Sequence, residues 1–597
     1  MFVLAQPKNN AMSALSELRL QLRTSVPATL SMLLYRLPWL LSLSFVGAIG
    51  SKELAAAALA TTLCNVTGMS LSVGLSSALS TLTGQARGEL MSPTGGSLRT
   101  IKRRDEAWGS MKKLVAYDEM TPLSSSSKPY GDACHFSFDD SNDDATEQYE
   151  DTKPILLPLV YLYRGIAIQL VFVIPVGCYW LHGMKPLLLY LGQGEELSTM
   201  TEQYLRILAP GLWGYSINFT LTTWLQVMEL AHVPAYAALV GCLLHVPMNL
   251  LFIHLVGLGW LGVGVATTIF QVIQPIAMFA YLKGTRHGKQ QLLQHIGAAG
   301  TGRTSLSFWC EAKAAISSIS GICQYITLAI PGVLTISEWW ASEICIFLSG
   351  SLTPQPNVAL GSMAIYQSLN SSCFMIPLGV SIGGSTRIGN QLGSGNSTGA
   401  RSSARVCVAL AGVMSSIMGS IMYFTPHTFF PSFFTSDATL IEMTSRVIPL
   451  VSIYVVGDGM QVALNAIIKG CGKQIVTVPI VICAYWIVAL PLAWYLAFVK
   501  SGGTTECNGQ SFCGIVGLVG GMTIGTWVHF ILLAVYSVCM IDWPLEAKLA
   551  NDRLSLERNK SKSTVNNNGD IGKDEPYVIN YGHRLSPVNL EAGVRQT

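Results

Sequence analysis

The chain has 597 residues, of which 50% are hydrophobic and only 12% are charged. Because an ordinary soluble domain carries about 25% charged residues, this balance and a mean hydropathy of +0.43 indicate a membrane protein with many spans. The formal net charge of +3 excludes the strong basic field that nucleic-acid binding requires. We therefore expect the lipid bilayer, and no nucleic acid, as a partner.

About twelve apolar stretches reach the roughly 20 residues that an α-helix needs to cross about 30 Å of hydrocarbon. In chain order they cover residues 28–48, 56–82, 155–180, 204–226, 234–256, 260–282, 326–349, 360–383, 406–425, 443–468, 476–498 and 514–540. We interpret the first stretch as an uncleaved spanning helix, because no cleavage site follows it. The sequence therefore predicts an all-α integral membrane protein with about twelve transmembrane helices.

Lysine and arginine are concentrated in alternate loops, which the positive-inside rule places in the cytosol. The opposite loops contain little more than Lys52, Lys185 and Lys500. Since an even number of spans puts both termini on one side, we expect residues 1–27 and the tail 541–597 to be cytosolic.

Two further polar segments fall on the same side. Residues 88–153 form an insert that is basic in its first half and acidic in its second, a composition that predicts disorder. Residues 283–325 are expected to be a cytosolic linker. Neither the insert nor the polar tail is expected to carry the chemistry.

A sequence motif occurs twice at a constant offset. Residues 74–88, GLSSALSTLTGQARG, resemble residues 379–393, GVSIGGSTRIGNQLG. Six predicted spans separate the copies, so the two halves have the same orientation and form a parallel repeat about an axis along the membrane normal. We therefore expect two six-helix lobes, residues 28–282 and 326–540, with a substrate path between them.

Acidic side chains inside the spans are few, and each costs about 2.5 to 3.5 kcal/mol at a helix centre. Glu338 and Asp458 lie near the middle of their predicted spans. Glu343 follows Glu338 by about 140° around the helix and about 7.5 Å along it, so we expect one glutamate to face an internal cavity and the other a neighbouring helix. The alternative is an intramembrane hydrogen-bond network without transport chemistry.

Other candidates each have two interpretations. Gln85 and Asn390 occupy equivalent repeat positions and are either a gate or helix-end caps. Trp339, Trp340 and Tyr366 either stack on a cation or pack in the ordinary way.

Three further features concern basic and sulfur-containing side chains. We expect Arg36, Arg164 and Arg206 to lie near span ends and to extend toward the membrane surface. His245 is either a proton relay or a histidine of the core. Cys507 and Cys513 share a predicted outer loop and could form a disulfide.

The segment Ser337-Glu338-Trp339-Trp340-Ala341-Ser342-Glu343 resembles the Glu-Trp-Trp-x-x-Glu signature of the seventh span in eukaryotic multidrug and toxin extrusion (MATE) transporters. The resemblance covers roughly residues 25–550 apart from the insert. Its other motifs lie at residues 46–55, 65–68, 81–86, 385–393, 458–461, 469–472 and 542–543.

The resemblance implies two lobes around a cleft that opens alternately to the two faces, and export of organic, mostly cationic, compounds in exchange for protons, with sodium as the alternative ion. By position, Glu338, Glu343 and Asp458 match acidic residues that the family uses for substrate and coupling-ion binding. Gln367 stands where some animal members have a glutamate, and Lys469 replaces an arginine. No catalytic residue, metal or cofactor is implied, and we expect a functional monomer.

Several alternatives stay open at this point. An exporter of organic anions such as citrate or phenolic acids would belong to the same family. A lipid-linked sugar flippase would need a cationic cleft, whereas the midplane charges here are acidic, and a membrane enzyme would need a nucleophile–base set or a metal cluster. The sequence chooses neither the substrate nor between the plasma membrane and a vacuolar or other internal membrane.

Overall fold

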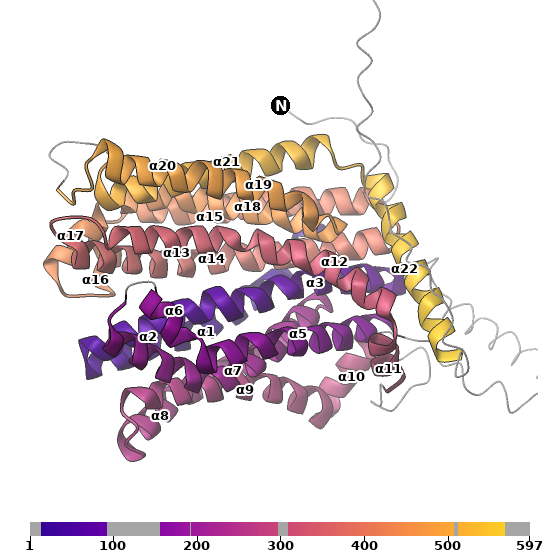
Figure 1. Cartoon of the computed structure of the whole chain (residues 1–597). Coiled ribbons are helices and arrows are strands. Elements are labelled where there is room, and N and C mark those ends of the chain that lie inside the picture. Colours follow the sequence, from indigo (N-terminus) through magenta and orange to yellow (C-terminus); the bar gives the residue numbers. More distant parts are fainter. Residues whose placement is uncertain (1–13, 92–155, 191–192, 297–308, 507–511, 567–597) are drawn as a thin grey trace, which may run out of the picture.

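The computed structural model describes residues 14–91, 156–190, 193–296, 309–506 and 512–566. Every regular element in these ranges is a helix, and each predicted span has a helical counterpart (Figure 1). The protein is an all-α membrane protein with two six-span lobes. The N-terminal lobe, coloured indigo to magenta, and the C-terminal lobe, coloured pink to yellow, lie side by side with their helices running in the same general direction.

The N-terminal lobe begins with the long helix α1. Its spans are α1 (Ala14–Ile49), α2 (Ser51–Cys64) continued through the π-helical η1 (Asn65–Met69) into α3 (Ser70–Met91), α5 (Leu157–His182), α7 (Glu195–Val227), α8 (His232–Leu250) with η4 (Leu251–Leu255), and α9 (Trp260–Gly284). The short helix α6 (Met184–Tyr190) joins α5 to α7. Because α3 continues to Met91, the insert starts later than the expected residue 88, and the structure describes nothing between 92 and 155.

The C-terminal lobe follows the same order of spans. They are α12 (Ile319–Thr335) with α13 (Ser337–Ser349), α14 (Pro356–Gly393), α15 (Ser397–Phe424), α18 (Ile448–Cys471), a segmented span of η6 (Gln474–Val476), α19 (Thr477–Val481), η7 (Ile482–Ala489), α20 (Leu490–Trp494) and η8 (Tyr495–Lys500), and finally α21 (Gly514–Cys539). Two short helices, α16 (Phe429–Ser432) and α17 (Ala438–Ser445), precede α18. In the loop before α21, Cys513 is disulfide-bonded, whereas Cys507 lies beyond the described ranges, so their pairing stays a prediction.

Ten helical segments of the described chain are long and apolar enough to cross a membrane by length and composition. The other two spans are α7 and α14, with 33 and 38 residues. Their apolar character is diluted by polar side chains that are buried inside the protein and do not face lipid. These include Thr201, Ser216, Asn218 and Thr220 on α7 and Ser362, Asn370, Ser381 and Thr386 on α14.

The lobes meet where the repeated motif brings α3 against α14. Gly84 faces Gly389, and a Cβ on Gly84 would lie 3.6 Å from the Cα of Gly389. A Cβ on Gly88 would clash with the Asn390 carbonyl oxygen, and one on Gly393 would clash with the Gln85 carbonyl oxygen. Gly88 and Gln85 of the first copy of the motif correspond to Gly393 and Asn390 of the second. Replacing each residue by its counterpart therefore turns one of the last two contacts into the other. The repeat therefore places its own glycines on a two-fold axis between the lobes.

The first span of each lobe also packs on the other lobe. On α14, Gly379 contacts Thr29 of α1, while on α3 the equivalent Gly74 contacts Val333 of α12. The seventh span starts at Ile319, earlier than the expected residue 326, and it breaks between α12 and α13 at Ile336. Its first half therefore packs on the N-terminal lobe, and only α13 lies wholly within the C-terminal one.

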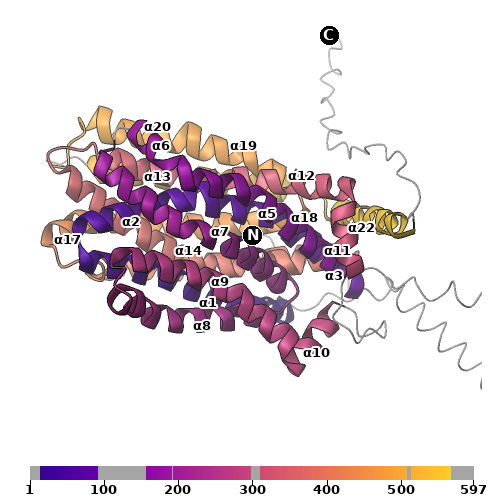
Figure 2. The same cartoon turned by 60° about the horizontal axis from the view of Figure 1, so that its bottom comes forward.

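The linker and the tail contain helices that the sequence did not indicate. The linker includes α10 (Arg286–His295) and α11 (Trp309–Ser317), and the tail includes α22 (Trp543–Asn566). Figure 1 and Figure 2 both place α22 across the end of the bundle where α11 lies. Nothing is described before residue 14 or after residue 566.

Ionic contacts join α22 to both lobes. Arg553 donates to the Cys471 carbonyl oxygen at 2.9 Å at the end of α18, and Glu546 pairs with Lys473. On the N-terminal lobe, Glu557 pairs with Arg164 at 2.8 Å. Arg164 reaches toward the end of the bundle, where α22 lies, as expected, but its side chain is 1% exposed and is held by the tail helix.

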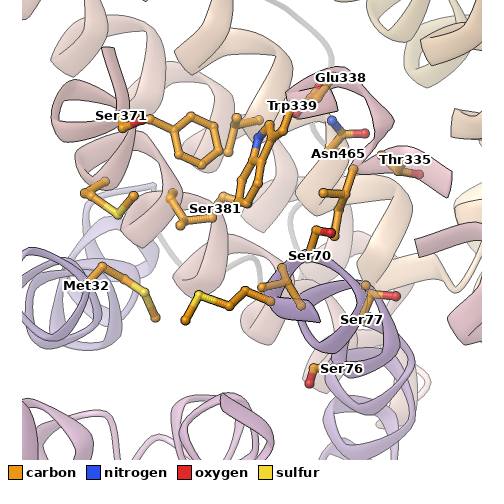
Figure 3. A pocket seen from close by; sticks show the side chains of 18 of the residues that line it. Met32, Ser70, Ser76, Ser77, Thr335, Glu338, Trp339, Ser371, Ser381 and Asn465 are labelled. Carbon is orange, nitrogen blue, oxygen red and sulfur yellow. The ribbon is translucent and has the colours of Figure 1, made fainter. Parts of the chain in front are cut away.

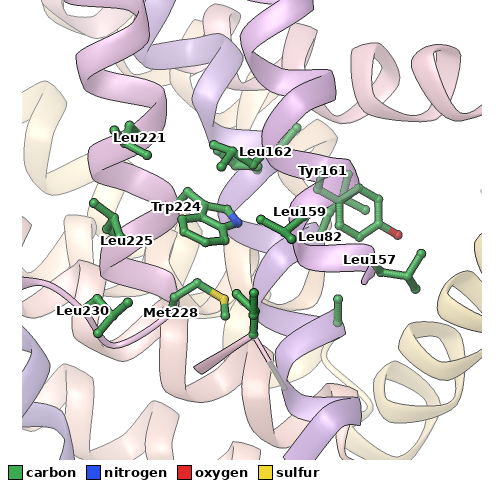
Figure 4. Packing of buried hydrophobic residues seen from close by; sticks show 14 of the residues in the cluster. Leu82, Leu157, Leu159, Tyr161, Leu162, Leu221, Trp224, Leu225, Met228 and Leu230 are labelled. Atoms are coloured by element: carbon green, nitrogen blue, oxygen red, sulfur yellow. The ribbon is translucent and has the colours of Figure 1, made fainter. Parts of the chain in front are cut away.

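Apolar packing supports this end of the N-terminal lobe. Leu82 of α3, Leu162 of α5 and Trp224 of α7 belong to one buried cluster (Figure 4). The Trp224 indole donates to the Pro158 carbonyl oxygen at 2.7 Å. The cluster fixes α3, which carries the motif of the interlobe contact.

Candidate functional site

A cavity of about 330 Å³ lies between the two lobes. Figure 3 shows side chains from both lobes around it, with Met32 and Ser70 on one side and Glu338 and Trp339 on the other. Ser80 and Lys469 line the cavity on the stretches of α3 and α18 that lead to the glycine contact. The cavity is therefore closed at the end where α3 meets α14.

All three predicted acidic residues line this cavity. One glutamate was expected to face the cavity and the other a neighbouring helix. Both line the cavity, and Glu338 also contacts the neighbouring helix α21 (Gly514–Cys539) through His529. The cavity touches α13 at Glu338, Trp339, Trp340, Ser342 and Glu343, which covers most of the circumference of that short helix. The break at Ile336 separates α13 from α12, and α13 lines the cavity over a wide arc. Two positions about 140° apart therefore both reach the cavity.

Glu338 lies in the first turn of α13, where the positive end of the helix dipole favours a carboxylate. Its Oε2 lies 3.4 Å from Nδ1 of His529 on α21, whose side chain is fully buried. Sequence reasoning missed His529, although an ionisable residue inside the predicted span 514–540 is the signal that identifies it. Oε2 of Glu338 and Nδ1 of His529 do not hydrogen-bond at this distance, and they form an ion pair only when His529 is protonated.

Asp458 is 5% exposed and begins a hydrogen-bonded chain along α18. Gln461 donates to Asp458 at 3.0 Å, and Asn465 donates to Gln461 at 2.9 Å. Both Asp458 and Asn465 line the cavity. The chain therefore connects two polar positions on the same wall.

Basic side chains line the cavity as well. Arg36 lies well inside α1 and lines the cavity together with Tyr35 and Trp39, so the expectation that it extends toward the membrane surface is wrong. Lys469 lines the cavity at the closed end. His245, by contrast, does not line it and hydrogen-bonds to Ser42 at 2.9 Å.

The aromatic candidates divide into two groups. Trp339 and Trp340 line the cavity, and the Trp340 indole donates to Ser70 across the lobes at 3.4 Å. Tyr366 does not line it, because the side chain is 1% exposed within the core of the C-terminal lobe. Gln367 does line the cavity and accepts a hydrogen bond from Ser342 at 2.8 Å.

Gln85 and Asn390 lie beyond the closed end of the cavity and do not line it. Gln85 donates to the Gly470 carbonyl oxygen at 3.1 Å. The Asn390 amide, oriented so that both of its polar atoms have partners, donates to the Gly84 carbonyl oxygen at 2.9 Å and accepts from Arg87 at 3.2 Å. Both amides thus contact the opposite lobe.

An ionic network lies beside these amides. Glu229, in the turn between α7 and α8, lies 2.9 Å from Arg87 and 4.0 Å from Arg387. Arg387 also pairs with Glu17 of α1 at 2.9 Å. Burial by itself would raise the pKa of Glu229, but Arg87 and Arg387 lower it below its usual range. Glu229 therefore stays ionised at neutral pH and joins charges of both lobes.

Two six-span lobes around a charged cavity that is closed at one end define a membrane transporter. The MatE family model matches residues 27–90, 159–251 and 332–495. Protein DETOXIFICATION 12 of Arabidopsis thaliana is 27% identical over 518 residues, which cover 87% of this chain and 88% of that protein. Multidrug and toxin extrusion protein 1 of Xenopus tropicalis is 27% identical over 551 residues, which cover 92% and 79%.

The fold is also that of solved MATE structures. The crystal structure of the eukaryotic MATE transporter AtDTX14 superimposes with a TM-score of 0.69 at 23% identity, covering 91% of this chain and 99% of that one. This chain belongs to the MatE family of multidrug and toxin extrusion transporters.

Proposed function

We propose that the protein is a secondary active antiporter that exports organic, mostly cationic, compounds in exchange for protons by alternating access. One observation carries the proposal. Glu338, Glu343 and Asp458, all from the C-terminal lobe, line one interlobe cavity that is closed at one end. The resemblance to MATE transporters assigns substrate and coupling-ion binding to the same three positions.

The cavity combines the two kinds of group that attract an organic cation. The carboxylates supply negative charge, and Trp339 and Trp340 supply aromatic faces. An aromatic face attracts a cation by about 0.5 to 2 kcal/mol, with the larger value in a site without water. A flat or bulky organic cation therefore suits this cavity better than a small, strongly hydrated ion.

Proton coupling follows when a proton and the substrate compete for the same carboxylates. A carboxylate attracts a cation only when it is ionised, so protonation releases the substrate and deprotonation restores its binding. The contact between Glu338 and His529 offers the proton a neighbouring acceptor. Sodium is the alternative coupling ion, and no cofactor is part of the proposal.

The cavity is closed at the end that we place in the cytosol, which corresponds to an outward-facing state of the transporter. The loops beyond the glycine contact carry most of the lysine and arginine, so we place that end, both termini and α22 in the cytosol. Opening to the cytosol would then separate Gly84 from Gly389 and Glu229 from Arg387. Gln85 and Asn390 would act as part of this gate. The structure supports them as interlobe contacts rather than as helix-end caps, since each hydrogen-bonds across the lobes.

The test is uptake of radiolabelled tetraethylammonium by sealed proteoliposomes with an acidic interior. We expect Asp458→Asn and Glu338→Gln each to lower the initial rate by about tenfold or more, because each removes a charge that the substrate or the proton needs. Glu442→Gln is the matched control, because Glu442 is exposed and lies outside the cavity. Near-normal uptake by either correctly inserted variant would remove that residue from the mechanism.

An exporter of organic anions is the second candidate, because Arg36 and Lys469 also line the cavity. A lipid-linked sugar flippase has less support, since the three carboxylates outnumber these two basic groups. Uptake of labelled citrate in the same vesicles distinguishes anion export from cation export.

A further inference from the structure

The tail helix α22 buries one of its faces against the ends of the spans. Both Figure 1 and Figure 2 show the helix lying across the bundle at this end. Its buried positions recur every three or four residues, as a helix lying on a surface requires, and they are Glu546, Ala547, Ala550, Arg553, Leu554 and Glu557. The helix is therefore packed on the bundle over about three turns.

The first half of α22 contacts the C-terminal lobe. Ala547 and Ala550 belong to the same buried cluster as Leu392 of α14. Glu546 pairs with Lys473, which follows α18. Only residues 540–542 separate α22 from α21, so a short covalent connection also ties this half of the helix to the C-terminal lobe.

The second half of α22 contacts the N-terminal lobe. Leu554 belongs to the same buried cluster as Leu82 of α3. Glu557 pairs with Arg164 of α5, and Arg558 pairs with Glu89 of α3 at 2.9 Å. A single helix thus bridges the two lobes at the closed end, where they would have to separate for the cavity to open on that side.

The contacts with the N-terminal lobe are largely ionic, which bears on how easily they come apart. When two buried ions separate into water, each regains the hydration that burial removed. An apolar contact regains nothing of the kind, because its separation exposes apolar surface at a cost that grows with the area. The pair of Glu89 and Arg558 is already 18% and 32% exposed. This half of α22 is therefore suited to detach and rebind.

We propose that α22 is a strap that holds the closed end shut, and that its second half detaches from the N-terminal lobe whenever the cavity opens to the cytosol. The short connection to α21 keeps the first half on the C-terminal lobe during this movement. The strap shifts the balance between the two states toward the outward-facing one. This inference goes beyond the proposed function, because it holds for any substrate or coupling ion.

The experiment measures how often the closed end opens, by chemical labelling from the cytosolic side. Ser80 lines the cavity near that end, so Ser80→Cys in the full-length protein serves as the reporter. Inside-out membrane vesicles, which expose the cytosolic face, receive a membrane-impermeant maleimide. Peptide mass spectrometry then gives the labelling rate at residue 80 separately from that of the native cysteines, and neither substrate nor an ion gradient is needed.

We expect Arg558→Glu to raise the labelling rate about fivefold, because it removes an ion pair and adds repulsion from Glu89. Combining Arg558→Glu with Glu89→Lys restores the pair with its charges exchanged and should return the rate to near the original value. Lys548→Glu, the same change of charge at an exposed position of the same helix, is the matched control and should leave the rate unchanged.

The fully buried Cys407 must stay unlabelled in each variant, which shows that the protein is folded. Arg558→Gln, which removes the pair without adding repulsion, should raise the rate about twofold and decides the question where the reversed charge unfolds the protein.

Unchanged labelling in folded Arg558→Glu would overturn the proposal, and so would an equal increase in Lys548→Glu. An exchanged pair that is labelled as fast as Arg558→Glu would also contradict it. Failure of tetraethylammonium antiport with the expected labelling pattern intact would instead contradict the proposed function and leave the strap in place.

Discussion

Burial distinguishes two ion pairs that have the same length. Arg164 and Glu557 lie 2.8 Å apart with both side chains 1% exposed. Arg446 and Glu442 also lie 2.8 Å apart, but their side chains are 42% and 70% exposed. An exposed pair contributes about 0 to 1 kcal/mol, whereas removing one partner of a buried pair leaves a charge that neither water nor protein compensates.

We therefore expect Glu557→Gln to lower the free energy of unfolding by about 3 to 5 kcal/mol, because Arg164 would keep its charge in a buried site. Glu442→Gln, the matched control, should cost less than about 1 kcal/mol. Thermal and denaturant-induced unfolding of the purified protein measures both changes. Similar small losses in the two variants would show that the tail helix does not hold Arg164 in solution.

The sequence indicates the residues of the site better than their partners. Each acidic residue near a predicted midplane lines the cavity. A carboxylate inside a span is costly, so such residues face the interior of the bundle or a cavity and not the lipid. The roles of Arg36 and His529 were missed although both lie within predicted spans. Hydropathy locates a residue along a helix, but it does not say which side of the helix faces a cavity.

The glycines of α3 and α14 differ in the space around them. A Cβ on Gly84 would make an ordinary contact with Gly389, but a Cβ on Gly88 or Gly393 would meet backbone oxygen atoms of the opposite lobe. Backbone cannot rotate away as a side chain can. The closed end therefore depends on two glycines that the repeat makes equivalent.

We expect Gly88→Ala and Gly393→Ala to destabilise the closed end by similar amounts, about 1 to 3 kcal/mol each, and to lower the melting temperature in detergent. Gly84→Ala is the control on the same helix and should change little. Scanning fluorimetry of the three variants makes the comparison. An equal effect of Gly84→Ala and Gly88→Ala would mean that the helices are farther apart than the structure has them.

At the level of elements, hydropathy predicts all twelve spans but not their ends or breaks. The break before α13 follows Pro331-Gly332, residues that interrupt helices but that a hydropathy average does not register. The tail helix α22 was missed because its sequence is polar, and its order comes from ionic contacts with residues far away in the chain, such as Arg164 and Lys473. Contacts of that kind have no signature in a local window.

At the scale of the whole molecule, the closed end is symmetric between the lobes, whereas the acidic site is not. The repeat supplies a closed end made of equivalent contacts from both lobes, whereas the acidic residues of the cavity belong to the C-terminal lobe alone. A symmetric frame can rock between two states, and an asymmetric site can make that movement depend on protonation. The exchange cycle that we propose needs both features.

The central claim is that a proton gradient drives this movement, and one measurement tests it most directly. Sealed proteoliposomes without sodium, with an acidic interior, are given radiolabelled tetraethylammonium outside. We expect the cation to accumulate inside as protons leave, and accumulation to stop when an ionophore collapses the pH gradient. Uptake that ignores the pH gradient and follows an imposed sodium gradient would contradict proton coupling.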